Sequence, residues 1–166
     1  MDDKARSNRR RTARKTKNLI CAITNTIAAL LDFETLLQND ENDNLTSQTD
    51  YVETLCWTGA CVSKLLKRLN KRSHLINFGD LDDLPEPDLD LQATLVGTIP
   101  CTKVCLDVGN TFKAYENAAW MAEADFAGGT ARFQGWADVN VDLREALVEK
   151  NGQLNAQIDR WLVAEL

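Results

Sequence analysis

The sequence predicts an all-α protein, a four-helix bundle with one long acidic, proline-containing crossover between its second and third helices and a basic N-terminal arm. Three observations predict it. Apolar residues recur at steps of three and four along four segments, all three prolines fall within residues 73–100, and residues 1–18 carry eight Lys or Arg against two Asp. Because 166 residues make one ordinary domain, we expect one helical domain, residues 19–166, after the arm, residues 1–18.

The first two helices are predicted from their apolar spacing. The first ends near Leu37 and can begin inside the arm, and a polar turn follows over residues 38–47. The second begins near Thr49, where Thr49 or Asp50 caps its free amides. The apolar face of the first helix consists of Leu19, Ile20, Ile23, Ile27, Leu30, Leu31, Phe33 and Leu37, and that of the second of Val52, Leu55, Gly59, Val62, Leu66 and Leu69.

Residues 73–100 read as an acidic strap, because proline disfavours a helix and Leu alternates there with Asp and Glu. The third helix begins after Pro100 and ends at Gly128 and Gly129. The fourth covers residues 142–165 as one helix, since its apolar register is kept across Asn151 and Gly152. The third helix has the seam Cys101, Cys105, Val108, Phe112, Tyr115, Ala119, Ala122 and Phe126, and the fourth Leu143, Leu147, Leu154, Ile158 and Trp161.

Charge is divided unevenly along the chain. The arm carries a net charge of +6. Because the whole chain has a net charge of −6, the remaining residues must carry −12. Arginine presents a planar fork that binds phosphate bidentately, and neutralising phosphates releases counterions. The arm therefore predicts backbone-driven binding of RNA or DNA, with an acidic protein, a membrane surface or a solvated tail as the alternatives. Its cations are Lys4, Arg6, Arg9, Arg10, Arg11, Arg14, Lys15 and Lys17.

A second basic stripe lies on the second helix, on the side away from its apolar seam. It consists of Lys64, Lys67, Arg68, Lys71 and Arg72. Cations near a helix C-terminus also complement the helix dipole, by about 0.3–1 kcal/mol each, so the stripe has a structural and a functional interpretation. If it joins the arm in binding nucleic acid, residues 4–17 and 64–72 should lie close enough to form one groove.

In composition, residues 4–17 resemble the basic N-terminal arms of small viral coat proteins and the arginine-rich RNA-binding segments of phage regulators. The resemblance implies an RNA-binding structural protein of a virus or phage, found in the cytoplasm or the virion. It covers the arm alone, and the bundle resembles no particular family.

Residues typical of catalysis and metal binding are sparse. The sequence has no phosphate-binding glycine loop, no HExxH motif and a single histidine, His74, which we expect in a turn. We therefore expect no enzyme, no cofactor and no metal. Cys101 and Cys105 have zinc-like spacing, but their place in an apolar seam favours core packing. No apolar run approaches the roughly 20 residues that span a membrane, so we expect a soluble protein.

Two functions follow from these expectations. The first is a nucleic-acid-binding structural or assembly protein that neutralises phosphate with its arm and forms homo-oligomers through the bundle. The alternative is a non-enzymatic adaptor or inhibitor, of phage or bacterial type, that binds a protein through its acidic strap. The acidic residues of that strap are Asp80, Asp82, Asp83, Glu86, Asp88 and Asp90.

Overall fold

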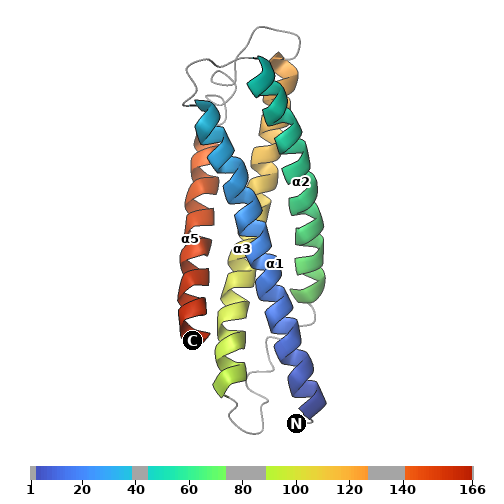
Figure 1. Cartoon of the computed structure of the whole chain (residues 1–166), viewed down its shortest axis with the longest axis vertical. Helices are drawn as coiled ribbons and strands as arrows, with labels where there is room; N and C mark the ends of the chain where they lie inside the picture. Colours follow the sequence, from blue (N-terminus) through green and yellow to red (C-terminus); the bar gives the residue numbers. More distant parts are fainter. Residues whose placement is uncertain (1–2, 39–44, 74–88, 127–140, 166) are drawn as a thin grey trace.

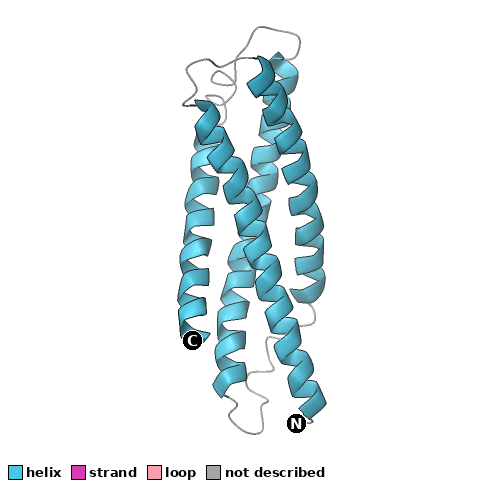
Figure 2. Cartoon of the chain, viewed as in Figure 1, coloured by secondary structure: helices cyan, strands magenta, loops and turns pink. Residues whose placement is uncertain are grey.

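The computed structural model describes residues 3–38, 45–73, 89–126 and 141–165, and all of them lie in helices (Figure 1, Figure 2). The helices are α1 (Asp3–Gln38), α2 (Leu45–Ser73), α3 (Leu89–Phe126) and α5 (Val141–Glu165). Among these residues there is no strand, and the predicted all-α four-helix architecture is confirmed. Residues 74–88, which include most of the predicted strap, lie outside the described ranges.

Consecutive helices run in opposite directions along the bundle (Figure 1). α1 packs against α2, α3 and α5, and α3 packs against α2 and α5. One end, at the bottom of Figure 1, therefore contains the start of α1, the end of α2, the start of α3 and the end of α5. We call it the lower end, and the opposite one the upper end.

A single core of buried apolar side chains runs through all four helices. By length and composition alone, residues 11–36 of α1 would also pass as a membrane-crossing helix. Ile20, Ile23, Ile27, Leu30 and Leu31 of this segment are buried in the bundle, whereas Leu36 is exposed. The seams predicted from the spacing are the buried faces. Their buried members are Ile20, Ile23, Ile27, Leu30 and Leu31 in α1; Leu55, Gly59, Val62, Leu66 and Leu69 in α2; Cys101, Cys105, Val108, Phe112, Tyr115 and Ala119 in α3; and Leu147, Leu154, Ile158 and Trp161 in α5.

The segment expected as a basic arm is the first part of α1, which is helical from Asp3. The reason is visible in the register: Ala13 and Thr16 continue the buried α1 seam at steps of three and four, and both are fully buried. The small Ala and the Thr hydroxyl, which donates a bond to the Thr12 carbonyl at 2.8 Å, allow close packing. The cations of this segment therefore project from a helix that belongs to the bundle.

The expectation that residues 73–100 form no helix was wrong for its last part, because α3 already begins at Leu89. Pro100 lies inside this helix, on an exposed position where its ring does not displace core side chains. Packing supports the helix on its other side. Thr98 and Thr102 are buried, and the Thr102 hydroxyl donates to the Thr98 carbonyl at 2.7 Å.

The last helix is continuous across Asn151 and Gly152, as predicted. Asn151 is buried and bonds to α1, since its Nδ2 donates to the Thr24 carbonyl at 3.3 Å. The Thr24 hydroxyl in turn donates to Asn151 Oδ1 at 2.8 Å. This pair of bonds between helices compensates for the low helix propensity of the Asn-Gly pair.

Candidate nucleic-acid interface

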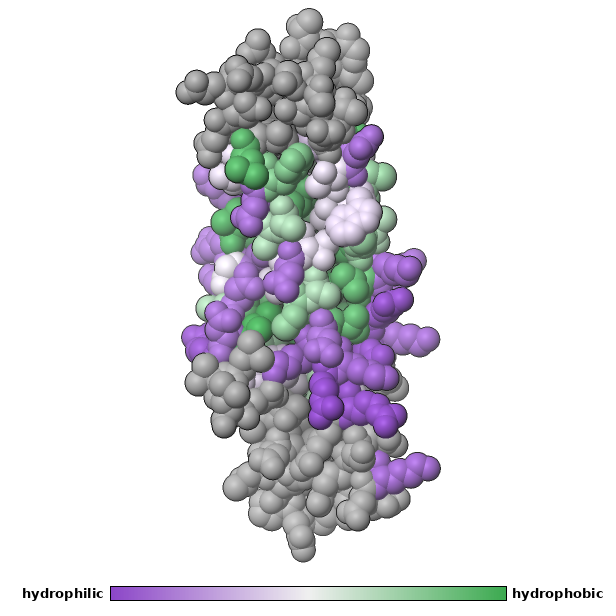
Figure 3. All heavy atoms as spheres, in the orientation of Figure 1, coloured by the Kyte–Doolittle hydropathy of each residue, from purple (hydrophilic) through white to green (hydrophobic). Residues whose placement is uncertain are grey.

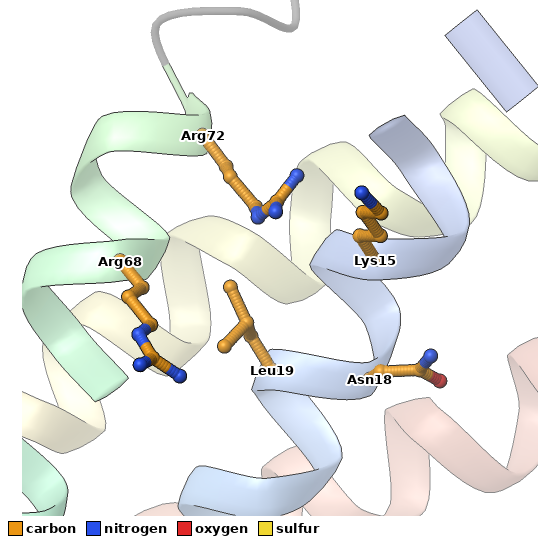
Figure 4. A pocket seen from close by; sticks show the side chains of 5 residues that line it. All are labelled: Lys15, Asn18, Leu19, Arg68 and Arg72. Atoms are coloured by element: carbon orange, nitrogen blue, oxygen red, sulfur yellow. The ribbon is translucent and has the colours of Figure 1, made fainter. Parts of the chain in front are cut away.

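A groove of about 310 Å³ lies between α1 and α2 at the lower end of the bundle. Lys15, Asn18, Leu19, Arg68 and Arg72 line it (Figure 4). In Figure 4 the arginine side chains extend from α2 toward α1, and Leu19 extends from α1 toward them. The predicted meeting of residues 4–17 with residues 64–72 is confirmed for these three cations.

The groove follows from helical spacing on two antiparallel helices. Lys15 and Leu19 are one turn apart on α1, and Arg68 and Arg72 are one turn apart on α2, so each pair shares a face. Leu19 supplies an apolar floor between the charges, and Asn18 adds an amide. No carboxylate is among these lining residues.

The chemistry of the groove suits a phosphate. Two guanidinium groups offer forked donors, and the Lys15 ammonium adds a third positive charge. A volume of 310 Å³ is about that of ten water molecules, enough for a phosphodiester with part of its sugar. Three cations with no carboxylate among the lining residues would attract an anion strongly despite the net negative charge of the chain.

Further cations extend the positive surface beyond the groove. Lys4 and Arg11 are exposed and share the Lys15 face of α1, because they precede it by eleven and four residues. Arg14 is exposed as well. Figure 3 shows hydrophilic side chains gathered over the lower half of this face of the bundle. On α2, Lys64, Lys67 and Lys71 are exposed in addition to Arg68 of the groove. The side chains of Arg6, Arg9 and Arg10 lie outside the described part.

Lys17 does not belong to this surface. Its Nζ lies 4.8 Å from the centre of the Trp161 ring, over α5. Two residues beyond Lys15, it points about 200° around α1, so it faces away from α2. The structure therefore places Lys17 apart from the groove, and its cation–π contact makes it part of the α1–α5 packing.

The dipole of α2 accounts for only part of its basic stripe. Lys71 and Arg72 occupy the last turn, where cations are stabilised by the helix C-terminus. Lys64, Lys67 and Arg68 lie farther from that end, and the dipole effect is confined to the last turn. Their position needs another explanation, which a negatively charged ligand would supply.

A buried polar layer near the upper end was not predicted from the sequence. It takes one side chain from each helix: Glu34 of α1, Tyr51 of α2, Tyr115 of α3 and Arg144 of α5. Both tyrosine hydroxyls donate to Glu34 Oε2, and Arg144 Nε donates to Oε1 at 3.1 Å. Arg144 also reaches the Leu31 carbonyl, at 3.1 Å. Glu34 is fully buried.

Burial governs the titration of this layer. Desolvation raises the pKa of the Glu34 carboxyl, although the bonds from Tyr115 and Tyr51 and the charge of Arg144 oppose the rise. Desolvation, together with the neighbouring Glu34, also raises the pKa of Tyr51 and of Tyr115, which stay protonated donors. Because these groups bond to one another across the four helices, we assign the layer to structure.

A register signal could have revealed this layer. Glu34 continues the α1 seam four residues after Leu30, and Arg144 and Asn151 fall in the α5 seam at steps of three and four around Leu147. A charged residue at a seam position is a candidate for a buried, paired charge. The apolar seams predicted from the sequence did not include them, because those seams were read from apolar residues alone.

The cysteines follow the sequence-based expectation. Cys101 and Cys105 belong to the hydrophobic core, so core packing is confirmed for both. Burial raises the pKa of the Cys105 thiol to about 12, which makes it a poor nucleophile. The acidic strap has no such outcome, because His74 and Asp80, Asp82, Asp83, Glu86 and Asp88 lie outside the described residues, as does the side chain of Asp90.

Comparison of the chain with protein-family models, curated proteins and solved structures finds no match. Within residues 3–38, 45–73, 89–126 and 141–165, no group of three or more His, Cys, Asp or Glu side chains is arranged to hold a metal ion. The groove between α1 and α2 is therefore the feature on which a functional proposal can rest.

Proposed function

We propose that this chain is a non-enzymatic nucleic-acid-binding protein with a structural or assembly role, which holds the phosphate backbone in the α1–α2 groove. The observation that carries the proposal is the convergence of Lys15, Arg68 and Arg72 on one groove without a lining carboxylate. Lys4 and Arg11 extend the same positive track along α1. The binding is driven by the backbone and applies to RNA and DNA alike.

Phosphate fits this groove better than a carboxylate partner does. Two arginines one turn apart can clamp successive oxygens of a phosphodiester, and the lysine supplies a point charge beside them. In a chain with a net charge of −6, a cluster of this kind concentrates the attraction at one place. The acidic remainder of the surface then disfavours phosphate elsewhere and orients the ligand.

Self-association through the bundle is the second part of the proposal. It is supported by large apolar side chains that are exposed toward the upper end, away from the groove, namely Leu36, Met121, Val141 and Val148. In such an assembly the lower end would remain available to nucleic acid while the upper end contacts other copies. The viral or phage origin suggested by the arm composition is part of the same proposal.

The test uses charge reversal in the full chain. Deleting residues 1–17 would remove Ala13 and Thr16 from the core, so a loss of binding would be ambiguous. The variant Lys15→Glu/Arg68→Glu/Arg72→Glu changes only groove side chains. We expect it to bind labelled RNA and DNA oligonucleotides at least about tenfold more weakly, with a salt slope shallower by about three, roughly one unit for each phosphate that is no longer neutralised.

The matched control is Lys103→Glu/Lys113→Glu/Arg160→Glu, which changes the net charge equally at exposed positions of α3 and α5. It should retain more affinity than the groove variant, and circular dichroism should show both folded. Equal losses in both variants would indicate a general charge effect and contradict the groove. Absence of binding in the unaltered protein would refute the proposed function.

A further inference from the structure

Trp57 is an unusually exposed tryptophan in the middle of a long helix. Its side chain is 64% exposed, although α2 continues for several turns on either side. The other tryptophans of the described helices are covered: Trp161 is buried and lies under Lys17, and Trp120 is half-buried against the core. No feature of the fold itself accounts for the position of Trp57.

Trp57 is aligned with the basic stripe of α2. At about 100° per residue, Trp57, Lys64, Arg68 and Lys71 fall within an arc of about 60° on the outward face, and all four are exposed. Lys64 follows Trp57 by about 10 Å along the axis and Arg68 by about 16 Å. Residues 54–73 contain no Asp or Glu. An aromatic surface and a cationic track thus share one helix face, and Arg68 connects this track to the groove.

This combination is characteristic of single-strand binding. Proteins that hold single-stranded nucleic acid combine cations along the backbone with aromatic side chains on which bases stack. In a duplex the base faces are already stacked on one another, so an exposed indole gains no equivalent contact. We propose, on the basis of the nucleic-acid function inferred above, that α2 binds a single strand, with Trp57 stacking on a base and Lys64, Arg68 and the groove holding the phosphates that follow.

A protein partner fits this face less well. A docking surface built on Trp57 would need apolar neighbours, yet exposed Ala60 and Cys56 are small, and Lys64 and Lys67 are charged. Four cations within about four turns of the indole complement a polyanion. The face therefore favours a strand of nucleic acid over a second protein.

The experiment compares the full chain with its Trp57→Ala and Trp57→Tyr variants. Fluorescence anisotropy measures the affinity for a labelled oligo(dT) or oligo(U) single strand and for a duplex of equal length. Without the indole on which a base stacks, single-strand binding should weaken about 5- to 100-fold in Trp57→Ala, whereas Trp57→Tyr should stay close to the unaltered protein. Duplex affinity should change little in either variant, and unlabelled oligo(dT) should quench less tryptophan fluorescence in Trp57→Tyr.

The possible outcomes separate this inference from the function on which it rests. If Trp57→Ala binds the single strand as tightly as the unaltered protein while Lys15→Glu/Arg68→Glu/Arg72→Glu does not, the stacking role is refuted and the phosphate groove stands. If the unaltered protein binds neither strand form, both proposals fail. If Trp57→Ala lowers the oligomeric mass measured by sedimentation but leaves the affinity for the single strand unchanged, Trp57 is a protein contact and the inference is overturned.

Discussion

Glu34 is the residue whose burial requires the most explanation. A fully buried carboxyl is costly unless its oxygens are bonded, and here three other helices supply the donors. The hydrogen bonds of this layer can all form only when the four helices are aligned with one another in a single register. Its contribution is to the uniqueness of the packing, since an apolar layer of equal volume would be at least as stable.

The raised pKa of Glu34 predicts an unusual pH dependence. Burial favours the neutral carboxyl in the folded chain, so the folded state binds a proton more tightly than the unfolded state does. The contribution of Glu34 to the free energy of unfolding is then fully present below the ordinary carboxyl pKa and is lost as the pH rises through the raised folded pKa. The free energy of unfolding of the unaltered protein, relative to Glu34→Gln, should decrease as the pH rises above the ordinary carboxyl pKa.

Urea unfolding at a series of pH values measures this difference. The matched control is Asp107→Asn, which removes an exposed carboxylate paired with Lys150 at 3.2 Å and should show little of the trend, because exposed ion pairs contribute little. A difference between the unaltered protein and Glu34→Gln that grows with pH would mean that the bonds from Tyr51, Tyr115 and Arg144 outweigh burial.

Whether a residue is buried was predictable from its spacing along the helix, but its chemical type alone was a misleading guide. Leu55, Val62 and Phe112 were assigned to the core because apolar type and spacing agreed. Glu34 and Arg144 have the spacing of core residues and the chemistry of surface residues, and the partners that reconcile the two come from other helices. Trp57 presents the reverse case, since it is a large aromatic residue whose phase on α2 lies outside the apolar seam, and it is exposed.

Among the helices, α3 depends most on close contact with a neighbour. The Trp161 ring of α5 lies against Gly97, where a Cβ atom would overlap the ring. Trp161 is buried and Lys17 also lies over its ring, so the ring has little room to move. This contact and the buried threonines Thr98 and Thr102 explain how a helix is maintained next to Pro100.

Two glycine substitutions should therefore act in opposite directions. Gly97→Ala should lower the free energy of unfolding by about 1–3 kcal/mol, because the overlap with Trp161 exceeds the gain in helix propensity. Gly152→Ala should raise it by about 0.5–1 kcal/mol, since nothing lies within 4 Å of its Cβ position. Chemical denaturation measures both. Stabilisation by Gly97→Ala would show that α3 and α5 are farther apart than described.

Helix boundaries were predictable where the apolar register marked them and were missed elsewhere. The start of α2 was predicted near Thr49, with Thr49 or Asp50 as its cap, but the helix already begins at Leu45, inside the predicted polar turn. The fourth helix was predicted within one residue at its start, and its continuity across Gly152 followed from the register. The start of α3 was missed by twelve residues, because Pro100 and the Leu-Asp alternation resemble a strap in isolation. Their helix depends on Gly97 and Thr98 meeting α5 and the core, which local sequence does not encode.

Across the whole molecule, the two ends of the bundle differ in chemistry. The lower end has the cationic groove and its extensions on α1 and α2, and the upper end has the buried Glu34 layer beneath exposed apolar side chains. The up-and-down topology produces this division, because it brings the start of α1 next to the end of α2. The meeting of two basic segments distant in the sequence was predictable only once this topology was assumed.

The exposed apolar side chains predict how copies associate. The unaltered chain should form an oligomer through the upper end, with a mass above 18.6 kDa, and Met121→Glu should weaken it because Met121 is 70% exposed there. Light scattering at several concentrations measures the mass. Ala156→Glu, at an exposed position toward the lower end of α5, is the matched control and should leave the mass unchanged. A monomer at all concentrations would contradict self-association.

The helical form of the basic segment has a further consequence. A disordered arginine-rich tail loses about 1–2 kcal/mol of backbone entropy per residue when it becomes ordered on a ligand. Residues 3–18 are already part of α1. The entropy loss therefore occurs when the protein folds, and it is not repeated when a ligand binds. In the proposed complex, cations carried on this helix would keep a fixed separation along its axis. The segment would then select a ligand with matching phosphate spacing and could not wrap around strands of arbitrary shape.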